Sequence, residues 1–437
     1  MPRYNQLLGN PLNVSWTTLP VYLFLVGIII VVGFLAGSYP AFFLSAFSPI
    51  QALKGKLKLG KGGASFRQVL VVIQFSISVF LILGTIVIAK QMRYVKDKQL
   101  GYDKAQTLII PIDNGDIYNN LNSFKTELQN QTAIQSVSAM SGVPGGFFDG
   151  QTFDVEGHTE KWNSNTEFAD FEFVKTLGLK IIAGRDFSPQ FPTDTTEAVL
   201  INKTAAAKLE WTPQQAIGKW IFNSTGDNNK RRIIGVVDDF NFQTLKQNIN
   251  ALVISPAQDR RQILVKLKAG NLQAGIAAVK NAYSKAATAY PLEYKFLDQQ
   301  FGELYQKDIR QQTILSVFSG LAIFVACLGL FGLASFTATK RFKEIGVRKV
   351  LGSSVQDIVM LLTRDLLKPV LIATCIALPV GYWAMNKWLQ NFAYKTNVSW
   401  WIFVSAALIT FGIALITVSI KAIRAAIENP VKSLRIE

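Results

Sequence analysis

Cysteine and histidine are nearly absent from this chain of 437 residues, which has two cysteines and one histidine. Cys327 and Cys375 both lie within apolar runs, so a disulfide framework and a Cys-x-x-Cys metal site are excluded. His158 stands outside any histidine or cysteine motif, which excludes most zinc and histidine-based nucleophilic chemistry. We expect the cysteines to be small packing residues and His158 to lie on the surface.

A complete phosphate-binding loop is also absent. Residues 55–61 match G-x-x-x-x-G-K, but Gly62 follows where a serine or threonine would hold magnesium, and no strand precedes the segment. We interpret it as a flexible basic loop near anionic lipid head groups. The motif therefore does not indicate a nucleotide hydrolase.

The most obvious carboxylate pair is Asp238 and Asp239. Adjacent side chains of an extended chain point to opposite faces, which is poor geometry for shared acid and base catalysis. We predict a turn at the end of a strand there, and a second turn at residues 184–187. Neither position indicates an active site.

Long apolar runs are abundant, and 49% of the residues are hydrophobic. A helix needs roughly 20 apolar residues to cross a bilayer. Five stretches without a charged residue are long enough, at residues 21–37, 69–89, 313–336, 369–385 and 400–420. The sequence thus predicts a membrane protein with a bundle of five transmembrane helices.

The formal net charge is +16, and basic residues lie beside these runs. This distribution favours a membrane topology over nucleic-acid binding. Residues 38–68 contain five lysines or arginines and no acid, and residues 340–368 contain seven basic residues. The positive-inside rule places both segments in the cytoplasm. By alternation, residues 91–310 and 387–399 lie outside, and the tail from Lys421 lies inside.

The long outside segment is predicted to be an α+β domain of about 200 residues, because strand-like and helix-like runs alternate between turn signals. The predicted strands are residues 107–112, 136–140, 198–201, 232–237 and 263–267. The predicted helices are residues 117–129, 203–209 and 272–289.

An internal repeat links the first and last spans. Asn-Val-Ser-Trp occurs at residues 13–16 and again at 397–400, and similar Pro-containing endings follow at 48–54 and 429–435. This pattern indicates duplication. We expect the first span to be the end of an earlier unit, so that the chain is a fragment, has a mis-assigned start or is part of a split protein. Sequencing upstream of Met1 tests this expectation.

The predicted spans offer one long polar side chain, Gln74, besides serine and threonine. Transporters driven by an ion gradient usually place titratable residues at membrane depth, so energy is expected to arrive from elsewhere.

The segment 340–352 is the best candidate for the site at which this energy enters the protein. There Glu344 and Arg348 form an i,i+4 pair, and Ile345 lies in an apolar stripe with Phe342 and Leu351. We predict a short amphipathic helix that ends near Gly352, followed by a helix that begins with an S-x-x-D motif at residues 354–357. Such a helix can dock into a groove of another protein. A plain basic loop on the lipid surface is the alternative.

Residues 341–352 resemble the R-x-x-E-I-G-x-R-[KR]-x-x-G element of the MacB/FtsX family of ABC transporter permeases. Segments 141–146, 177–187, 199–202 and 234–240 are similar to the family's MacB-type periplasmic core domain. The resemblance covers essentially the whole chain. It implies four parts: an incomplete first FtsX-like unit at 1–66, a transmembrane helix at 67–92, a periplasmic core domain at 93–309 and an FtsX-like domain with three transmembrane helices at 310–437.

The resemblance further implies a non-catalytic permease of a bacterial inner membrane, with its large domain in the periplasm. A separate cytoplasmic ATPase would bind ATP and magnesium, so no cofactor, metal or catalytic residue is expected in this chain. The implied ATPase-contact residues are Arg341, Glu344, Ile345, Gly346, Val347, Arg348 and Lys349.

Other implied partners are a second permease chain or half, membrane lipid, and a periplasmic adaptor or substrate protein. The implied cargo is a peptide, drug or lipoprotein. Two alternatives remain open: an FtsX-like regulator of a cell-envelope enzyme, and a membrane-anchored sensor. A sensor would normally need a cytoplasmic signalling domain, for which the inside segments are short.

Overall fold

The computed structural model describes residues 19–45, 62–146, 148–225, 229–256 and 260–427. They fall into two compact units. The membrane unit comprises described residues up to Lys90, Asp308–Trp388 and those from Asn397 onward, and the external unit comprises Gln91–Lys307 and Leu389–Thr396. The P-loop-like segment, the 13–16 motif and the two Pro-containing endings lie outside the described residues.

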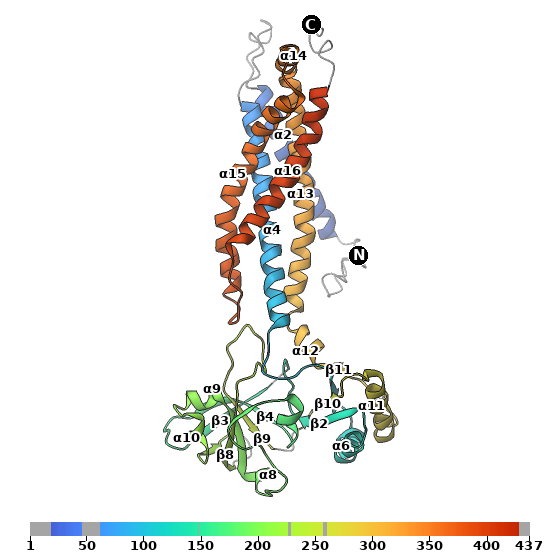
Figure 1. Cartoon of the computed structure of the whole chain (residues 1–437), viewed down its shortest axis with the longest axis vertical. Coiled ribbons are helices and arrows are strands. Elements are labelled where there is room, and N and C mark those ends of the chain that lie inside the picture. The colour runs from blue at the N-terminus through green and yellow to red at the C-terminus, as the bar shows by residue number, and fades with distance from the viewer. Residues whose placement is uncertain (1–18, 46–61, 147, 226–228, 257–259, 428–437) are drawn as a thin grey trace. The chain divides into compact units, whose positions relative to one another are not determined.

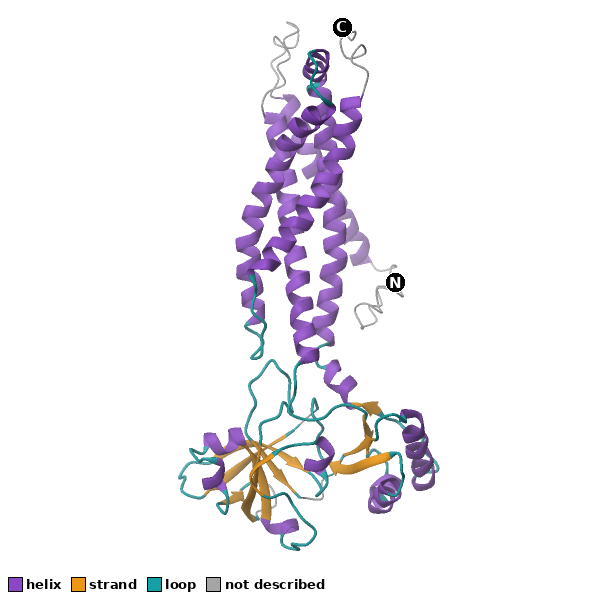
Figure 2. Cartoon of the chain, in the orientation of Figure 1, coloured by secondary structure: helices purple, strands orange, loops and turns teal. Residues whose placement is uncertain are grey.

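The described residues of the membrane unit form helices joined by short non-helical segments (Figures 1 and 2). Its helices are α2 (Leu19–Ser45), α4 (Gly62–Asp97), α13 (Gln306–Lys340), α14 (Phe342–Val350), α15 (Val355–Leu389) and α16 (Trp400–Ile427). Within the described chain, four of them, α4, α13, α15 and α16, are long and apolar enough to cross a membrane. The first predicted span is also helical, but only Leu19–Phe34 of α2 qualifies as an apolar helix, and it is shorter than a span. The predicted count of five is therefore not confirmed.

The four long helices share one apolar core. Phe75 of α4, Leu330 of α13, Val370 of α15 and Val418 of α16 are buried together in it. Four alanines, Ala326, Ala334, Ala373 and Ala414, complete the contact. Small residues let membrane helices approach closely, which is how such helices gain packing energy in lipid.

The first lobe of the external unit is a four-stranded antiparallel sheet in the order β11-β1-β10-β2. The strands are β1 (Thr107–Pro111), β2 (Ile134–Met140), β10 (Gln262–Leu267) and β11 (Lys295–Phe296). Leu108, Ile110 and Val265 alternate along the strands toward a core that they share with helices α5 (Gly115–Asn119), α6 (Leu121–Gln129) and α11 (Leu272–Ala286). Helices thus cover one face of this sheet.

The second lobe is a seven-stranded mixed sheet in the order β5-β8-β6-β9-β4-β3-β7. Because β7 also pairs with β8, the sheet curls back on itself. Its strands are β3 (Asp149–Val155), β4 (Trp162–Phe168), β5 (Ile181–Gly184), β6 (Ala198–Asn202), β7 (Trp220–Asn223), β8 (Lys230–Val237) and β9 (Leu252–Ser255). The remaining short helices are α7 (Phe173–Leu177), α8 (Asp194–Glu197), α9 (Lys203–Lys208), α10 (Pro213–Ala216) and α12 (Leu297–Glu303).

All five predicted strands are present, and the predicted helix over residues 117–129 is broken at Asn120 into α5 and α6. Strand β8 ends at Val237, as predicted. Asp239 then accepts hydrogen bonds from the backbone and hydroxyl of Thr204, at 2.9 and 2.8 Å, and so holds the start of α9. His158 is exposed, as expected.

The loop between α15 and α16 belongs to the external unit. Tyr394 N donates to Leu245 O at 3.2 Å, and the Gln91 amide donates to Tyr394 O at 2.9 Å and accepts from Thr396 N at 2.8 Å. This packing agrees with the predicted position of residues 91–310 and 387–399 on the same side of the membrane.

Candidate functional site

The predicted docking segment forms the helix α14, and caps define both its C-terminal end and the start of α15. Gly352 has a φ of +90°, a left-handed conformation that favours glycine. Its N–H donates to Lys349 O at 3.2 Å, and Ser353 N donates to Arg348 O at 3.0 Å. The Ser354 hydroxyl donates to Asp357 Oδ2 at 2.7 Å and accepts from Asp357 N at 3.2 Å. Both predicted caps are confirmed, and the turn between α14 and α15 is short.

The inner side of α14 is held by Ile345, which is 5% exposed. It packs against Ile358 and Leu362 of α15 and Ala422 of α16. Gly346 is also buried. Burial of an isoleucine side chain stabilises by about 1.5–3 kcal/mol, so Ile345 fixes α14 to the ends of two long helices.

The start of α14 is tied to α15 by an ion cluster that no local sequence pattern indicates. Arg341 Nη2 lies 2.9 Å from Asp365 Oδ2, and Lys368 Nζ lies 2.8 Å from Asp365 Oδ1. The side chains of Arg341 and Asp365 are 34% and 30% exposed. A partly exposed pair of this kind contributes about 1 kcal/mol at most, so its main effect is to orient the junction between α13 and α14.

The outer side of α14 carries exposed apolar side chains. Val347, Val350 and Leu351 are 48%, 64% and 79% exposed. Beside them, Arg348 Nη2 and Glu344 Oε1 form the predicted pair at 2.9 Å. The predicted single stripe is therefore divided, because Ile345 faces the bundle whereas Leu351 faces away from it.

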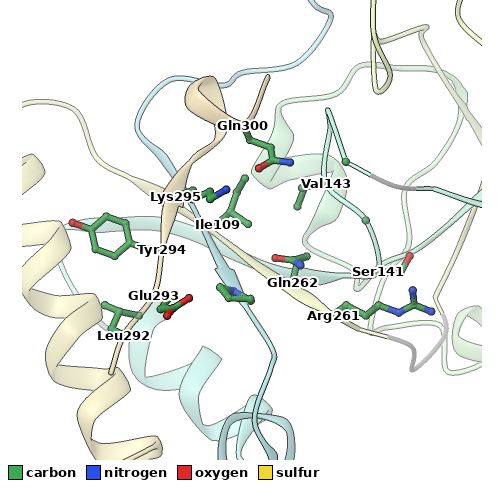
Figure 3. Close-up of a pocket in the computed structure, with 13 residues that line it drawn as sticks. Ile109, Ser141, Val143, Arg261, Gln262, Leu292, Glu293, Tyr294, Lys295 and Gln300 are labelled. Carbon is green, nitrogen blue, oxygen red and sulfur yellow. The ribbon is translucent and has the colours of Figure 1, made fainter. Parts of the chain in front are cut away.

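A second candidate site is a cavity of about 680 Å³ in the external unit (Figure 3). Its floor is the face of the four-stranded sheet opposite the core that α5, α6 and α11 cover, where Ile109 and Gln262 project. Val143, from the segment that follows β2, lines the cavity, and Arg261 and Glu293 lie on opposite sides of Gln262 in this view. The cavity thus combines an apolar floor with amide and charged groups.

The comparisons with known proteins agree with this architecture. Residues 316–430 match the family model for the FtsX-like permease C-terminal domain, and residues 69–282 match that for the MacB-like periplasmic core domain. The chain belongs to the MacB/FtsX family of ABC transporter permeases. The FtsX-like match contains the whole of α14 with its caps, and the MacB-like match contains most of the external unit.

One curated relative is an uncharacterized ABC transporter permease, YknZ of Bacillus subtilis strain 168, at 27% identity over 128 residues. That match covers 29% of this chain and 32% of the relative. Among solved structures, the chain is similar to the periplasmic region of MacB from Actinobacillus actinomycetemcomitans, with 17% identity, coverage of 46% of this chain and 93% of that one, and a TM-score of 0.35. It is also similar to the extracellular domain of YknZ from Gram-positive bacteria, with 14% identity, coverage of 43% and 99%, and a TM-score of 0.32.

Within the MacB-like domain, one buried acid supports the cavity wall. Glu167 Oε1 accepts hydrogen bonds from Ser141 N, the Ser141 hydroxyl and Gly142 N at 2.9, 3.0 and 2.9 Å. Its other oxygen, Oε2, is buried and has no partner among the described residues. Burial raises the pKa of Glu167 to about 8, although the three hydrogen bonds oppose the shift. Glu167 is therefore mostly neutral at pH 7.

We expect the stability of this wall to fall as the pH rises from about 4.5 to about 8. The folded state binds the Glu167 proton more tightly than the unfolded state, so unfolding releases this proton between these two pH values. Because a higher pH favours proton release, it also favours unfolding. Glu167→Gln keeps the shape of the side chain without a titrating proton, so protection of the Ser141 and Gly142 amides should vary less with pH. Hydrogen exchange at pH 5.5 and 8, corrected for intrinsic rates, measures this. Equal pH dependence in the two proteins would contradict the assignment.

Proposed function

We propose that this permease couples ATP hydrolysis by a separate cytoplasmic ATPase to a change of shape in its external domain, and that α14 is the contact. The observation that carries the proposal is the contrast between the two sides of α14. One side is anchored by Ile345 and the Arg341–Asp365 pair, and the other exposes Val347, Val350 and Leu351. Exposed apolar side chains beside charges are typical of a docking surface.

The anchored side supplies the mechanical path. A force on α14 would reach α15 and α16 through Ile345 and its partners. The loop that joins α15 to α16 is hydrogen-bonded within the external unit through Tyr394, and the rest of that unit is inserted in sequence between α4 and α13. In this mechanism each long helix acts as a lever between the ATPase and the external domain.

The ATPase would bind ATP and magnesium and would supply all catalytic groups. A second permease chain or half would complete the transporter in a bacterial inner membrane, with the external domain in the periplasm. Cargo, such as a peptide, drug or lipoprotein, would be handled on the outer side. The cavity at Gln262 is suited to such a contact because apolar, amide and charged groups meet there.

Co-purification of the full chain with its genetically linked ATPase tests the proposal. We expect a stable complex in detergent, with an ATPase rate that depends on the permease. An ATPase that neither binds the chain nor changes its rate would contradict the coupling role.

A further inference from the structure

A groove of about 620 Å³ lies within the membrane unit between α4, α13 and α15. Its walls are mostly apolar side chains, Val69, Val72, Ile73, Leu333, Leu366 and Ile372. Ile73 and Ile372 are 50% and 51% exposed, so the groove is open along its side. An apolar groove on the side of a spanning bundle is suited to a hydrocarbon chain.

The groove also has a charged end. Arg341, Asp365 and Lys368 line it there, and two cations share a single carboxylate, at 2.9 and 2.8 Å. The cluster therefore keeps one net positive charge. Arg341 follows directly after the last residue of α13, Lys340, so this end lies where the span leaves the lipid on the predicted cytoplasmic side.

These two parts match an amphiphile with an acyl chain and an anionic head. We propose that the groove binds an anionic phospholipid of the cytoplasmic leaflet, with its phosphate at Arg341 and Lys368. Arginine and lysine bind phosphate oxygens through charge-assisted hydrogen bonds. The acyl chain gains little from the apolar walls relative to bulk lipid, so selectivity comes from the head group. If a second protein chain occupied the groove instead, it would have to provide an acidic side chain to neutralise the excess positive charge.

Selectivity for the head group can be measured on the full chain in nanodiscs that contain phosphatidylglycerol and phosphatidylcholine in equal amounts. After extraction, native mass spectrometry counts the lipids that remain bound. We expect phosphatidylglycerol to be retained preferentially. Lys368→Gln should weaken its binding about fivefold, because one lysine near an anionic surface contributes about 1 kcal/mol. Equal retention of both lipids, or no loss in Lys368→Gln, would overturn the proposal.

Lys387 provides a matched control on the same helix. It lies near the opposite end of α15, over the ring of Trp383 at 5.4 Å, so Lys387→Gln should leave phosphatidylglycerol retention unchanged. Ile73→Trp should reduce retention by filling the groove without changing its charge. If only dimers form and they carry no phosphatidylglycerol, a second copy occupies the groove and the lipid proposal fails. The readout is lipid mass, so it is independent of any ATPase.

Discussion

Leu351→Asp is expected to weaken the complex with the ATPase about thirtyfold or more. Leu351 is the most exposed of the three apolar side chains on the outer side of α14, at 79%. Loss of an apolar anchor at the centre of an interface costs about 2 kcal/mol or more. Titration of the labelled ATPase against the detergent-solubilised permease gives the affinity.

The substitution should leave the permease itself folded, because Leu351 makes little contact within the chain. Tyr118→Asp is the control, since Tyr118 is 61% exposed in the external unit and lies outside the proposed contact. Both variants should elute like the wild type in size exclusion. Unchanged ATPase affinity in Leu351→Asp would show that the outer side of α14 is not the docking surface.

Charge reversal separates docking from helix stability. Glu344→Lys and Arg348→Glu each break a surface pair that contributes about 0.5 kcal/mol or less to the helix. The double variant restores a pair of opposite charges within α14 but presents them in exchanged positions. We expect all three proteins to bind the ATPase weakly. Recovery in the double variant would mean that the pair acts only within the helix.

Gly235→Ala is expected to destabilise the external unit by about 3 kcal/mol, which lowers its thermal midpoint by roughly 6–12 °C for a domain of this size. Gly235 lies in β8 and pairs with Gly184 of β5. A Cβ atom on Gly235 would lie 2.2 Å from the backbone oxygen of Arg185 and 2.9 Å from Leu200 Cδ2. The backbone of one strand would have to move, and β8 is held on both sides.

A glycine in another strand of the same sheet provides the control. Gly150 in β3 has no atom within 4 Å of the position that its Cβ would occupy. Gly150→Ala should therefore leave the midpoint unchanged or raise it slightly, because alanine restricts the unfolded chain. Thermal melts of the full chain, with limited proteolysis to assign the transition, compare the two. Similar midpoints for Gly235→Ala and Gly150→Ala would show that β5 and β8 do not approach this closely.

The hydrophobic pattern predicted an element correctly wherever that element has the same surroundings, lipid or protein core, along its whole length. Four apolar runs became α4, α13, α15 and α16, since a bilayer requires a span of about 20 predominantly apolar residues. Strands β1, β6 and β10 were found because nearly all their residues are buried. By contrast, β3 and β4 are rich in polar residues, so no apolar run marks them, and their regularity comes from pairing with each other and with β7 and β9.

The sequence alone determined that α14 exists and where it ends, because its C-terminal cap at Gly352, the Ser354 cap of α15 and the Glu344–Arg348 pair are local interactions within a few residues. It could not determine which way each apolar residue of α14 faces. Ile345 is buried because α15 and α16 pass beside it, and Arg341 is held by Asp365, 24 positions further along the chain. Those neighbours come together only when the helices pack, so tertiary structure decided which residues anchor the helix and which remain exposed.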